Sequence, residues 1–381
     1  MLPGKQATAL EQQLRAQLGA AQRLVVKVGS QALCRPDGRL DGRMVAGLCQ
    51  DLAALQEAGK QVVLVSSGAV ASGLGEVGAD RGLHKQALAA IGQPLLMARY
   101  RMEFTGLGRH VAQILLTHSD LANRSRFLHA RRVMAELMAA GILPIVNEND
   151  TVAVDELKFG DNDQLAAQVA HVVEADVLVL LTEVDGLFTA DPGVDPTAQR
   201  ISLVRYRDTD SMAMAGDSKS AFGTGGMRSK MVAAQKASAV GCVTVIARGK
   251  TSDVLSRLLA GEDAGTVFEP APRRLTGKRS WIATSVRPRG TVTVDAGAVA
   301  ALQQGGRSLL LAGVTAVQGE FAVGDPLQVV GPDGSAIGRG LSRYDAEDAR
   351  QVVGLRTEQV SQVLGWLPAA ELIHRDDFVL S

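Results

Sequence analysis

Short apolar runs rich in β-branched residues recur between residues 24 and 246, and longer segments with helical spacing separate most of them. Strands that are apolar on both faces and alternate with helices are typical of a mostly parallel sheet with helices on both sides. The pattern therefore predicts an α/β domain. The predicted strands are 24–28, 62–65, 114–116, 142–146, 177–181 and 243–246. The predicted helices are 43–58, 82–104, 126–140, 163–174 and 228–239.

The sequence pattern changes near Phe268. Residues 269–274 read Glu-Pro-Ala-Pro-Arg-Arg, which is typical of a linker. Short alternating segments then follow, separated by glycine-containing turns, and they predict a small β-barrel or sandwich with strands at 291–294, 308–311, 327–330 and 336–341. We therefore expect an N-terminal extension at 1–22, the main α/β domain at 23–270, a linker at 271–285 and a β domain at 286–381.

The composition excludes several classes of function. A formal net charge of +0 gives no general attraction for nucleic acid or for an anionic membrane. The three cysteines, Cys34, Cys49 and Cys242, lie far apart and form no C-x-x-C pair, which favours reduced thiols over disulfides or a zinc site. No run approaches the roughly 20 apolar residues of a membrane-spanning helix, and residues 9–21 lack the apolar core of a signal peptide. We expect a cytoplasmic protein with no membrane partner.

Residues suited to anions follow the first two predicted strands, at the ends where parallel sheets bind ligands. Lys27 and Gly29 end the first strand, and a cation beside a glycine turn can hold a phosphate; an ordinary surface lysine at a turn is the alternative. Ser66, Ser67 and Gly68 follow the second strand and open a predicted helix, whose N–H groups suit a carboxylate or a phosphate. The alternative there is N-capping by one of the serines.

Residues 73–78 read Gly-Leu-Gly-Glu-Val-Gly, which matches the G-x-G-x-x-G pattern of dinucleotide-binding proteins. That pattern belongs in the tight turn that leaves a strand, whereas this match lies well beyond the second predicted strand. We therefore do not assign it to a dinucleotide.

Two polar clusters, at 147–150 and 160–163, follow the fourth predicted strand and open the helix after it. They read Asn-Glu-Asn-Asp and Gly-Asp-Asn-Asp, so carboxylates and amides could converge at one edge of the sheet. Together they can bind an ammonium group, orient a carboxylate or hold Mg²⁺ through water. Each cluster alone also fits a structural role, as an Asx-rich turn and as an N-cap by Asp161 or Asn162.

A glycine-rich loop at 223–230 leads into the last predicted helix of the α/β domain. Its glycines allow close approach of the backbone, the helix N-terminus attracts anions, and Lys230 can meet a migrating phosphoryl group. The spacing is not that of a Walker A loop, and a flexible surface loop is the alternative. All four elements lie at the ends of strands or the starts of helices, and together they favour a site that binds anionic ligands.

In their order along the sequence, these motifs resemble those of the amino acid kinase family. The resemblance implies a three-layer α/β/α sandwich on a mainly parallel sheet, with residues 23–270 as the catalytic domain. Residues 286–368 resemble the PUA domain, a small β pseudo-barrel often appended within this family. The segments that carry the kinase resemblance are 27–30, 65–69, 116–117, 123–127, 144–150, 159–163, 181–182, 186–192, 223–227 and Lys230.

The resemblance also implies roles for individual residues. Lys27 and Lys230 are expected at the ATP phosphates, and Asp161 and Asp163 form an acidic pair near the reaction centre; these four are the candidate catalytic residues. Glu183 departs from the Asp that many relatives carry there. The candidate substrate-binding residues are Ser67, Gly68, Asp150 and Asn162. The candidate ATP-binding residues are Lys27, Thr182, Glu183, Thr224, Gly225, Gly226, Met227, Arg228, Ser229 and Lys230.

The implied reaction uses ATP and Mg²⁺ to phosphorylate the side-chain carboxylate of L-glutamate, giving L-glutamyl 5-phosphate in the first step of proline biosynthesis. The implied partners are further copies of the chain, proline as a feedback inhibitor and glutamyl phosphate reductase as recipient of the product. The alternatives are family members that act on N-acetylglutamate, aspartate, carbamate or UMP, and an RNA-binding regulator. Residues 286–381 carry eight Arg and no Lys against eleven Asp plus Glu, a formal charge of −3, which argues against RNA and favours a structural or regulatory role for the β domain.

Overall fold

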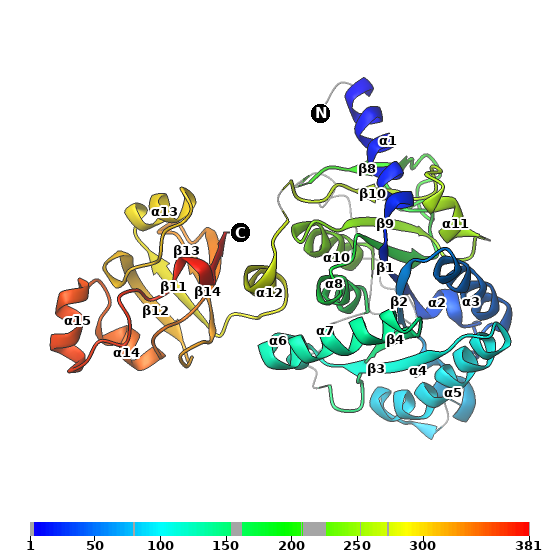
Figure 1. Cartoon of the computed structure of the whole chain (residues 1–381), viewed down its shortest axis with the longest axis horizontal. Helices are drawn as coiled ribbons and strands as arrows, with labels where there is room; N and C mark the ends of the chain where they lie inside the picture. Colours follow the sequence, from blue (N-terminus) through cyan, green and yellow to red (C-terminus); the bar gives the residue numbers. More distant parts are fainter. Residues whose placement is uncertain are drawn as a thin grey trace. The chain divides into compact units, whose positions relative to one another are not determined.

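The computed structural model describes residues 4–78, 81–153, 162–206, 208, 226–251, 253–272 and 274–380. The chain divides into two compact units, Met1–Arg274 and Leu275–Ser381 (Figure 1). The segment expected to be a linker contains helix α12 (Gly277–Thr284), whose Trp281 and Ile282 are buried and which contacts strands of the second unit. The domain boundaries expected from the sequence remain a prediction.

An eight-stranded sheet is the centre of the first unit, in the order β3-β4-β2-β1-β5-β9-β10-β8. Every pairing in it is parallel except that between β9 and β10. The mainly parallel sheet predicted from the sequence is therefore confirmed, and β8 and β10 extend it beyond the predicted strands. The strands are β1 (Arg23–Val28), β2 (Gln61–Ser66), β3 (Val111–Leu116), β4 (Leu143–Glu148), β5 (Val177–Thr182), β8 (Leu203–Val204), β9 (Val243–Arg248) and β10 (Thr266–Phe268). A separate pair is formed by β6 (Leu187–Phe188) and β7 (Arg200–Ile201).

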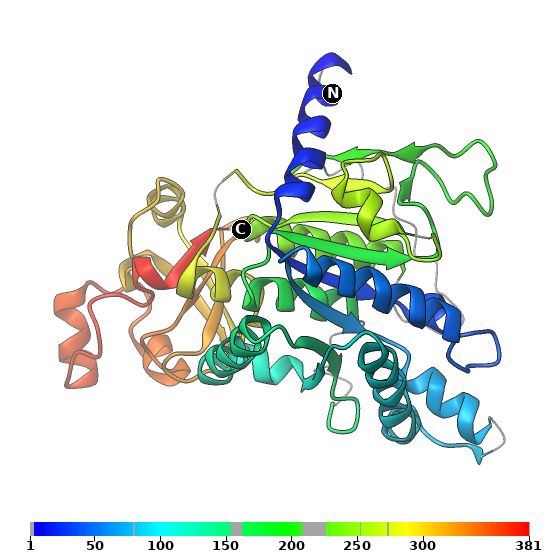
Figure 2. The ribbon, with the colours of Figure 1, turned by 45° about the vertical axis from the view of Figure 1, so that its right-hand side comes forward.

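Helices cover both faces of this sheet (Figures 1 and 2), which confirms the three-layer arrangement. Helices α7, α8 and α10 pack against the central strands on one face, while α1, α3 and α11 lie together on the other. The helices of this unit are α1 (Gly4–Ala20), α2 (Ser30–Leu33), α3 (Gly42–Glu57), α4 (Ala69–Val77), α5 (Lys85–Gly106), α6 (His118–Ala122), α7 (Arg124–Ala139), α8 (Asn162–Val172), α10 (Met227–Ala239) and α11 (Val254–Leu259).

Strand alternation decides which side chains meet each helical layer, because successive residues of a strand point to opposite faces. Leu24, Val26 and Val28 of β1 belong to the core shared with α1, α3, α5 and α11. Val25 and Lys27 therefore point to the opposite face, toward α8 and α10. The alternation along β1 thus places Lys27 on the face covered by α8 and α10, two helices that carry polar residues near their N-termini.

The N-terminal extension is a helix that packs on the main unit rather than a free tail. Leu14 and Leu18 of α1 are buried in the core. Arg15, which is 5% exposed, donates to the carbonyl oxygen of Glu262 at 2.9 Å and pairs with Asp263 at 2.6 Å. The extension thus adds apolar cover and a buried arginine to the edge of the fold at α11 and β10.

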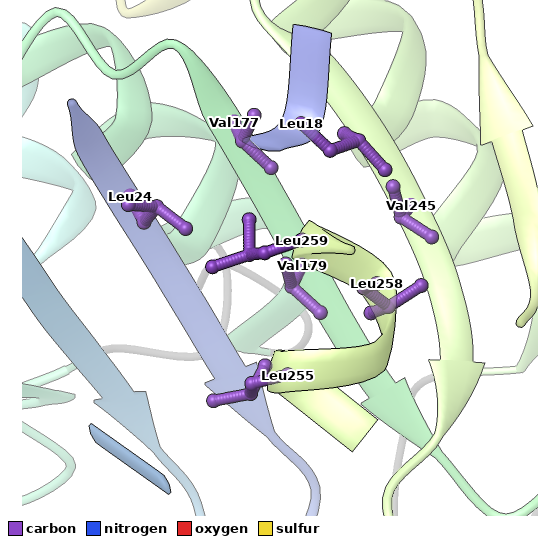
Figure 3. Close-up of a pocket in the computed structure, with 8 residues that line it drawn as sticks. All are labelled: Leu18, Leu24, Val177, Val179, Val245, Leu255, Leu258 and Leu259. Atoms are coloured by element: carbon purple, nitrogen blue, oxygen red, sulfur yellow. The ribbon is translucent and has the colours of Figure 1, made fainter. Parts of the chain in front are cut away.

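The pocket in Figure 3 belongs to this packing and is not a substrate site. It is lined entirely by Leu and Val side chains, from α1, from α11 and from strands of the sheet. Leu24 and Val177 are near the amino ends of their strands, so the pocket lies away from the carboxyl ends where ligands bind. A lining without polar groups offers nothing to orient a charged substrate.

Helices α4 and α5 approach each other so closely that only glycine fits at two contact points. A β-carbon on Gly73 would lie 1.9 Å from the carbonyl oxygen of Leu88, and one on Gly92 would lie 1.8 Å from that of Ala69. Gly73 is the first glycine of the G-x-G-x-x-G match, which the structure places inside helix α4. The pattern therefore reflects helix packing here.

We expect Gly92→Ala to lower the free energy of unfolding by about 3 kcal/mol, because the added methyl group forces two helices apart. Gly47→Ala is the matched control, since Gly47 is an exposed residue of α3 with nothing within 4 Å of its β-carbon position. That control should gain about 0.5–1 kcal/mol from helix propensity. Urea unfolding followed by far-ultraviolet circular dichroism measures both values. Equal effects of the two substitutions would contradict the close packing.

The second unit is built on a five-stranded sheet in the order β12-β11-β13-β14-β15, parallel only between β11 and β13. The β domain predicted from the sequence is confirmed. The strand predicted at 308–311 is wrong, since Leu309 forms only an isolated bridge with Ile373 and the chain turns at Leu311. The elements are α12, β11 (Gly290–Val294), α13 (Ala296–Gln303), η3 (Leu311–Gly313), β12 (Val314–Gly319), β13 (Pro326–Val330), β14 (Ala336–Leu341), α14 (Ala346–Gln351), α15 (Thr357–Leu364), η4 (Arg375–Asp377) and β15 (Phe378–Leu380).

Candidate active site

The carboxyl ends of the central strands meet at one edge of the sheet. Val28 at the end of β1 lies opposite Ser66 of β2 and Leu181 of β5. Strand β2 pairs with β1 on one side, and β5 pairs with β1 on the other side. The direction in which the chain adds strands therefore reverses at β1. Such a switch point opens a crevice at the carboxyl edge, which is the usual ligand site of an open α/β sheet.

A buried cluster of two lysines and one aspartate lies just inside this edge. The carboxylate of Asp163, in the first turn of α8, is fully buried. The Nζ of Lys27 on β1 lies 2.6 Å from Asp163 Oδ1, and the Nζ of Lys230 on α10 lies 3.0 Å from Oδ2. Both lysines are also buried, at 5% and 6% exposed. One carboxylate therefore holds two ammonium groups in place, and the cluster carries a net positive charge.

The charges of the cluster decide the protonation of Asp163. Burial alone would raise the pKa of this carboxyl group, because it disfavours the ionised form. The positive charges of Lys27 and then Lys230, with the hydrogen bonds that both donate, outweigh burial and lower the pKa below its ordinary value. Asp163 therefore stays ionised at neutral pH and cannot serve as a general acid there.

A second group of side chains is formed by amides beside the end of β2. The Nδ2 of Asn162 lies 3.0 Å from the carbonyl oxygen of Ser66, 2.9 Å from Ser67 Oγ and 2.9 Å from Asn147 Oδ1. Asn162 opens α8 and directly precedes Asp163, so the amide group and the lysine cluster share one helix start. Ser67 and Asn162, both expected to bind substrate, are in direct contact.

The turn between β2 and α4 is shaped for an anion. Gly68 is the N-cap residue of α4 and has a φ of 107°, a conformation that side chains rarely adopt. Gly68 has no side chain that could cap the helix, so it leaves the first N–H groups of α4 to other partners, which a ligand at the positive end of the helix can supply. The turn can therefore receive a carboxylate, as the sequence suggested.

The remaining predicted residues that the structure describes lie around the same edge of the sheet. Thr182 ends β5, and its carbonyl oxygen accepts from the N–H of Gly249 at 2.7 Å. Glu183 lies 3.5 Å from the Nζ of Lys250 on the surface. Asp150 follows the end of β4, and Gly226 is the N-cap of α10, ahead of Met227, Arg228 and Ser229. Asp161, Thr224 and Gly225 lie outside the described residues.

Sequence reasoning missed Gln164, which ties the two helices of the lysine cluster together. Its Nε2 donates to the carbonyl oxygen of Ser229 at 3.0 Å, and its Oε1 accepts from Lys236 Nζ at 2.6 Å. It therefore fixes the start of α10, and with it Lys230, relative to α8. A glutamine in the first turn of a helix carries no sequence signal for such a contact.

Among the described residues, no group of three or more His, Cys, Asp or Glu side chains could hold a metal ion. Asp163, the buried carboxylate of the site, already has an ammonium group at each oxygen. These residues therefore do not fit a resident Mg²⁺ site. In the same part of the chain, no helix combines the length and the hydrophobicity needed to cross a bilayer.

Comparisons with known proteins agree with this architecture. The model of the amino acid kinase family matches residues 22–248, and that of the PUA domain matches residues 290–364. A relative named glutamate 5-kinase from Trichlorobacter lovleyi is 46% identical over 370 residues, which cover 96% of this chain and 98% of the relative. Relatives of the same name from Stutzerimonas stutzeri and Ralstonia nicotianae are 45% and 46% identical over 372 residues, covering 96% of this chain and 100% and 99% of their own.

An α/β sheet with two buried lysines at its carboxyl edge is suited to a protein that binds phosphate groups. This chain belongs to the amino acid kinase family and carries a C-terminal PUA domain.

Proposed function

We propose that this chain catalyses the reaction after which its relatives are named, the ATP-dependent phosphorylation of the side-chain carboxylate of L-glutamate. The products are L-glutamyl 5-phosphate and ADP, in the first step of proline biosynthesis. The observation that carries the proposal is the buried cluster of Lys27, Asp163 and Lys230 beside the amide group of Asn162 and Ser67. The cluster suits the phosphates of ATP, and the amides suit an amino acid.

The acceptor needs no general base. A glutamate side chain has an ordinary pKa of about 4.3, so its carboxylate is already ionised at neutral pH. The barrier lies in bringing this anion to a triphosphate, which requires positive charge and alignment rather than proton transfer. Lys27 and Lys230 supply the charge, and their shared contact with Asp163 keeps both ammonium groups at fixed positions before ATP arrives. Asp163 acts in this proposal as an ionised anchor.

The amide group and the turn at Gly68 suit the rest of the glutamate molecule. The N–H groups at the start of α4 are donors for a carboxylate. The side chains of Asp150 and Asn162 provide oxygen acceptors for the α-ammonium group. In this proposal, Ser67 holds Asn162 through the 2.9 Å hydrogen bond between them. Mg²⁺ enters as part of the MgATP substrate, because the described residues offer no cage of their own.

A hydroxylamine-trapping assay tests the proposal. L-glutamate with ATP should give the hydroxamate of an acyl phosphate together with ADP, while N-acetylglutamate, aspartate and carbamate in parallel should give far less product. Preference for N-acetylglutamate or another acceptor would reassign the chain within its family. Salt-sensitive RNA binding without any phosphotransfer would instead favour the alternative function of an RNA-binding regulator.

We also propose three partners, on the basis of the resemblance alone. Proline inhibits by occupying the glutamate pocket, the labile product passes to glutamyl phosphate reductase, and the chain forms a homo-oligomer. Activity that is unchanged at millimolar proline would remove the first of these.

A further inference from the structure

Three amide side chains form a hydrogen-bonded chain across the carboxyl edge of the sheet. Asn147, at the end of β4, donates from Nδ2 to Gln93 Oε1 on helix α5 at 2.8 Å. The Oδ1 of Asn147 accepts from Asn162 Nδ2 on α8 at 2.9 Å. Because α5 and α8 pack on opposite faces of the sheet, Asn147 links the two layers beside the candidate substrate-binding residues.

Backbone groups at two points fix the direction in which this chain of amides runs. The N–H of Glu148, which can only donate, points to Asn147 Oδ1 at 2.9 Å. The carbonyl oxygen of Ser66, which can only accept, faces Asn162 Nδ2 at 3.0 Å. The Nδ2 of Asn147 must therefore face α5, where Gln93 supplies the acceptor. Asn147 is only 3% exposed, so without Gln93 a buried donor would lose its partner.

The same hydrogen-bond directions determine which atom of Asn162 is left for a ligand. With its nitrogen turned toward Ser66 and Asn147, Asn162 keeps its Oδ1 as an acceptor, and among the described residues this oxygen receives no hydrogen bond. Asn162 is half-buried, so a ligand can reach it. An acceptor at this place suits a protonated amine, such as the α-ammonium group of an amino acid.

Helix α5 is held at this position by contacts on either side of Gln93. Gly92 lies against the carbonyl oxygen of Ala69, the first residue of α4. Tyr100, two turns further along α5 and fully buried, shares a 2.9 Å hydrogen bond with Ser66 Oγ. Gln93 therefore belongs to a helix that is anchored both to the end of β2 at Ser66 and to the start of α4 at Ala69.

We propose that Gln93 is a positioning residue for the substrate amine: it holds Asn147, which in turn orients Asn162 toward the ligand. The inference rests on the proposed function, because Asn162 is taken there as a glutamate-binding residue. Gln93 acts through Asn147 and touches neither ATP nor the lysine cluster. Its loss should therefore weaken glutamate binding selectively.

Kinetics of three variants test this inference in the full-length enzyme. Gln93→Leu removes the acceptor and should raise the KM for L-glutamate about tenfold, with little change in kcat or in the KM for ATP. Gln93→Glu keeps an oxygen at the same position and should restore a KM close to that of the wild type. Gln86→Leu, the same substitution earlier on α5 at a side chain with no hydrogen bond among the described residues, should leave all constants near wild type.

Calorimetric titration with L-glutamate in a double-mutant cycle tests the route through Asn147. In an Asn147→Ala background, Gln93→Leu should cause no further loss of glutamate affinity, because the contact that it removes is already absent. Fully additive losses would overturn the inference, as would an unchanged glutamate KM in Gln93→Leu or a fall in kcat with both KM values unaltered. A wild-type enzyme that makes no acyl phosphate from glutamate would overturn the proposed function itself, so the two failures are distinguishable.

Discussion

Lys230→Ala should lower kcat by about 10²-fold or more, because it removes one of the two buried charges that we propose stabilise the transferred phosphoryl group. The Nζ of Lys230 is buried and held 3.0 Å from Asp163, and a fixed charge interacts more strongly in such a low-dielectric position than on the surface. Asp163 keeps Lys27 as a partner in the variant, so we expect the fold to persist. Steady-state kinetics at saturating ATP and glutamate measure the effect.

Lys236→Ala is the matched control, since it removes the same charge from the same helix. Lys236 lies nearly two turns further along α10, where it donates to Gln164 instead of Asp163. The kcat of Lys236→Ala should stay close to that of the wild type, because Gln164 keeps its hydrogen bond to the carbonyl oxygen of Ser229 and Lys230 keeps its contact with Asp163. A folded Lys230→Ala enzyme with nearly normal turnover would contradict the role assigned to the cluster.

Asp163→Asn should destabilise the protein by about 3 kcal/mol or more and also abolish most of its activity. The variant keeps the shape of the side chain but removes the negative charge that two buried ammonium groups share, and breaking a buried ion pair in this way is costly in a low-dielectric interior. Displacement of the lysines by even about 1 Å can lower the rate about 10²-fold. Urea unfolding followed by circular dichroism at pH 7 gives the stability, and the hydroxylamine assay gives the rate.

A double variant separates the two effects of Asp163→Asn. Adding Lys27→Met removes one of the two buried positive charges that lost Asp163 as their partner, so much of the lost stability should return while activity stays low. An Asp163→Asn protein as stable as the wild type at pH 7 would contradict the proposed anchoring of the lysines.

The lowered pKa of Asp163 also predicts how its contribution depends on pH. A carboxyl group whose pKa is lower in the folded state than in the unfolded chain stabilises the fold fully above the unfolded value, here 3.8. This contribution is lost as the pH falls through the lower folded value. The stability difference between wild type and Asp163→Asn should therefore be constant between pH 7 and about 5 and shrink below 3.8. A stability difference that grows as the pH falls below 3.8 would contradict a lowered pKa of Asp163 in the folded state.

The architecture of the sheet was largely predictable from the chain. In a parallel sheet both faces are buried, so runs such as residues 177–181 are apolar throughout and stand out from the amphipathic helices between them. Strand β12 (Val314–Gly319) of the second unit was missed because its side chains are mostly half-buried or exposed and include Thr and Gln. The segment 308–311 alternates like a strand, yet beyond Leu309 it turns into a short helix.

The candidate site was predictable only in part. Lys27 lies near the carboxyl end of β1 and the turn at Gly68 follows β2, and a parallel sheet brings such ends to one edge regardless of their separation in sequence. Gln93 gave no such signal, because a glutamine in the middle of a helix is usually solvated. Only the close contact of α4 with α5 at Gly92, which a sequence pattern does not encode, brings Gln93 within hydrogen-bond distance of Asn147.

The order of apolar runs and glycine turns therefore determined the layers of this protein and the edge of the sheet at which the candidate site lies. The tertiary structure alone decided that Asp163 is shared by Lys27 and Lys230, and that Gln93 reaches Asn147. The physical reason is that periodicity along the chain fixes which face a side chain takes, whereas the partner it meets there depends on how separate helices pack across the sheet.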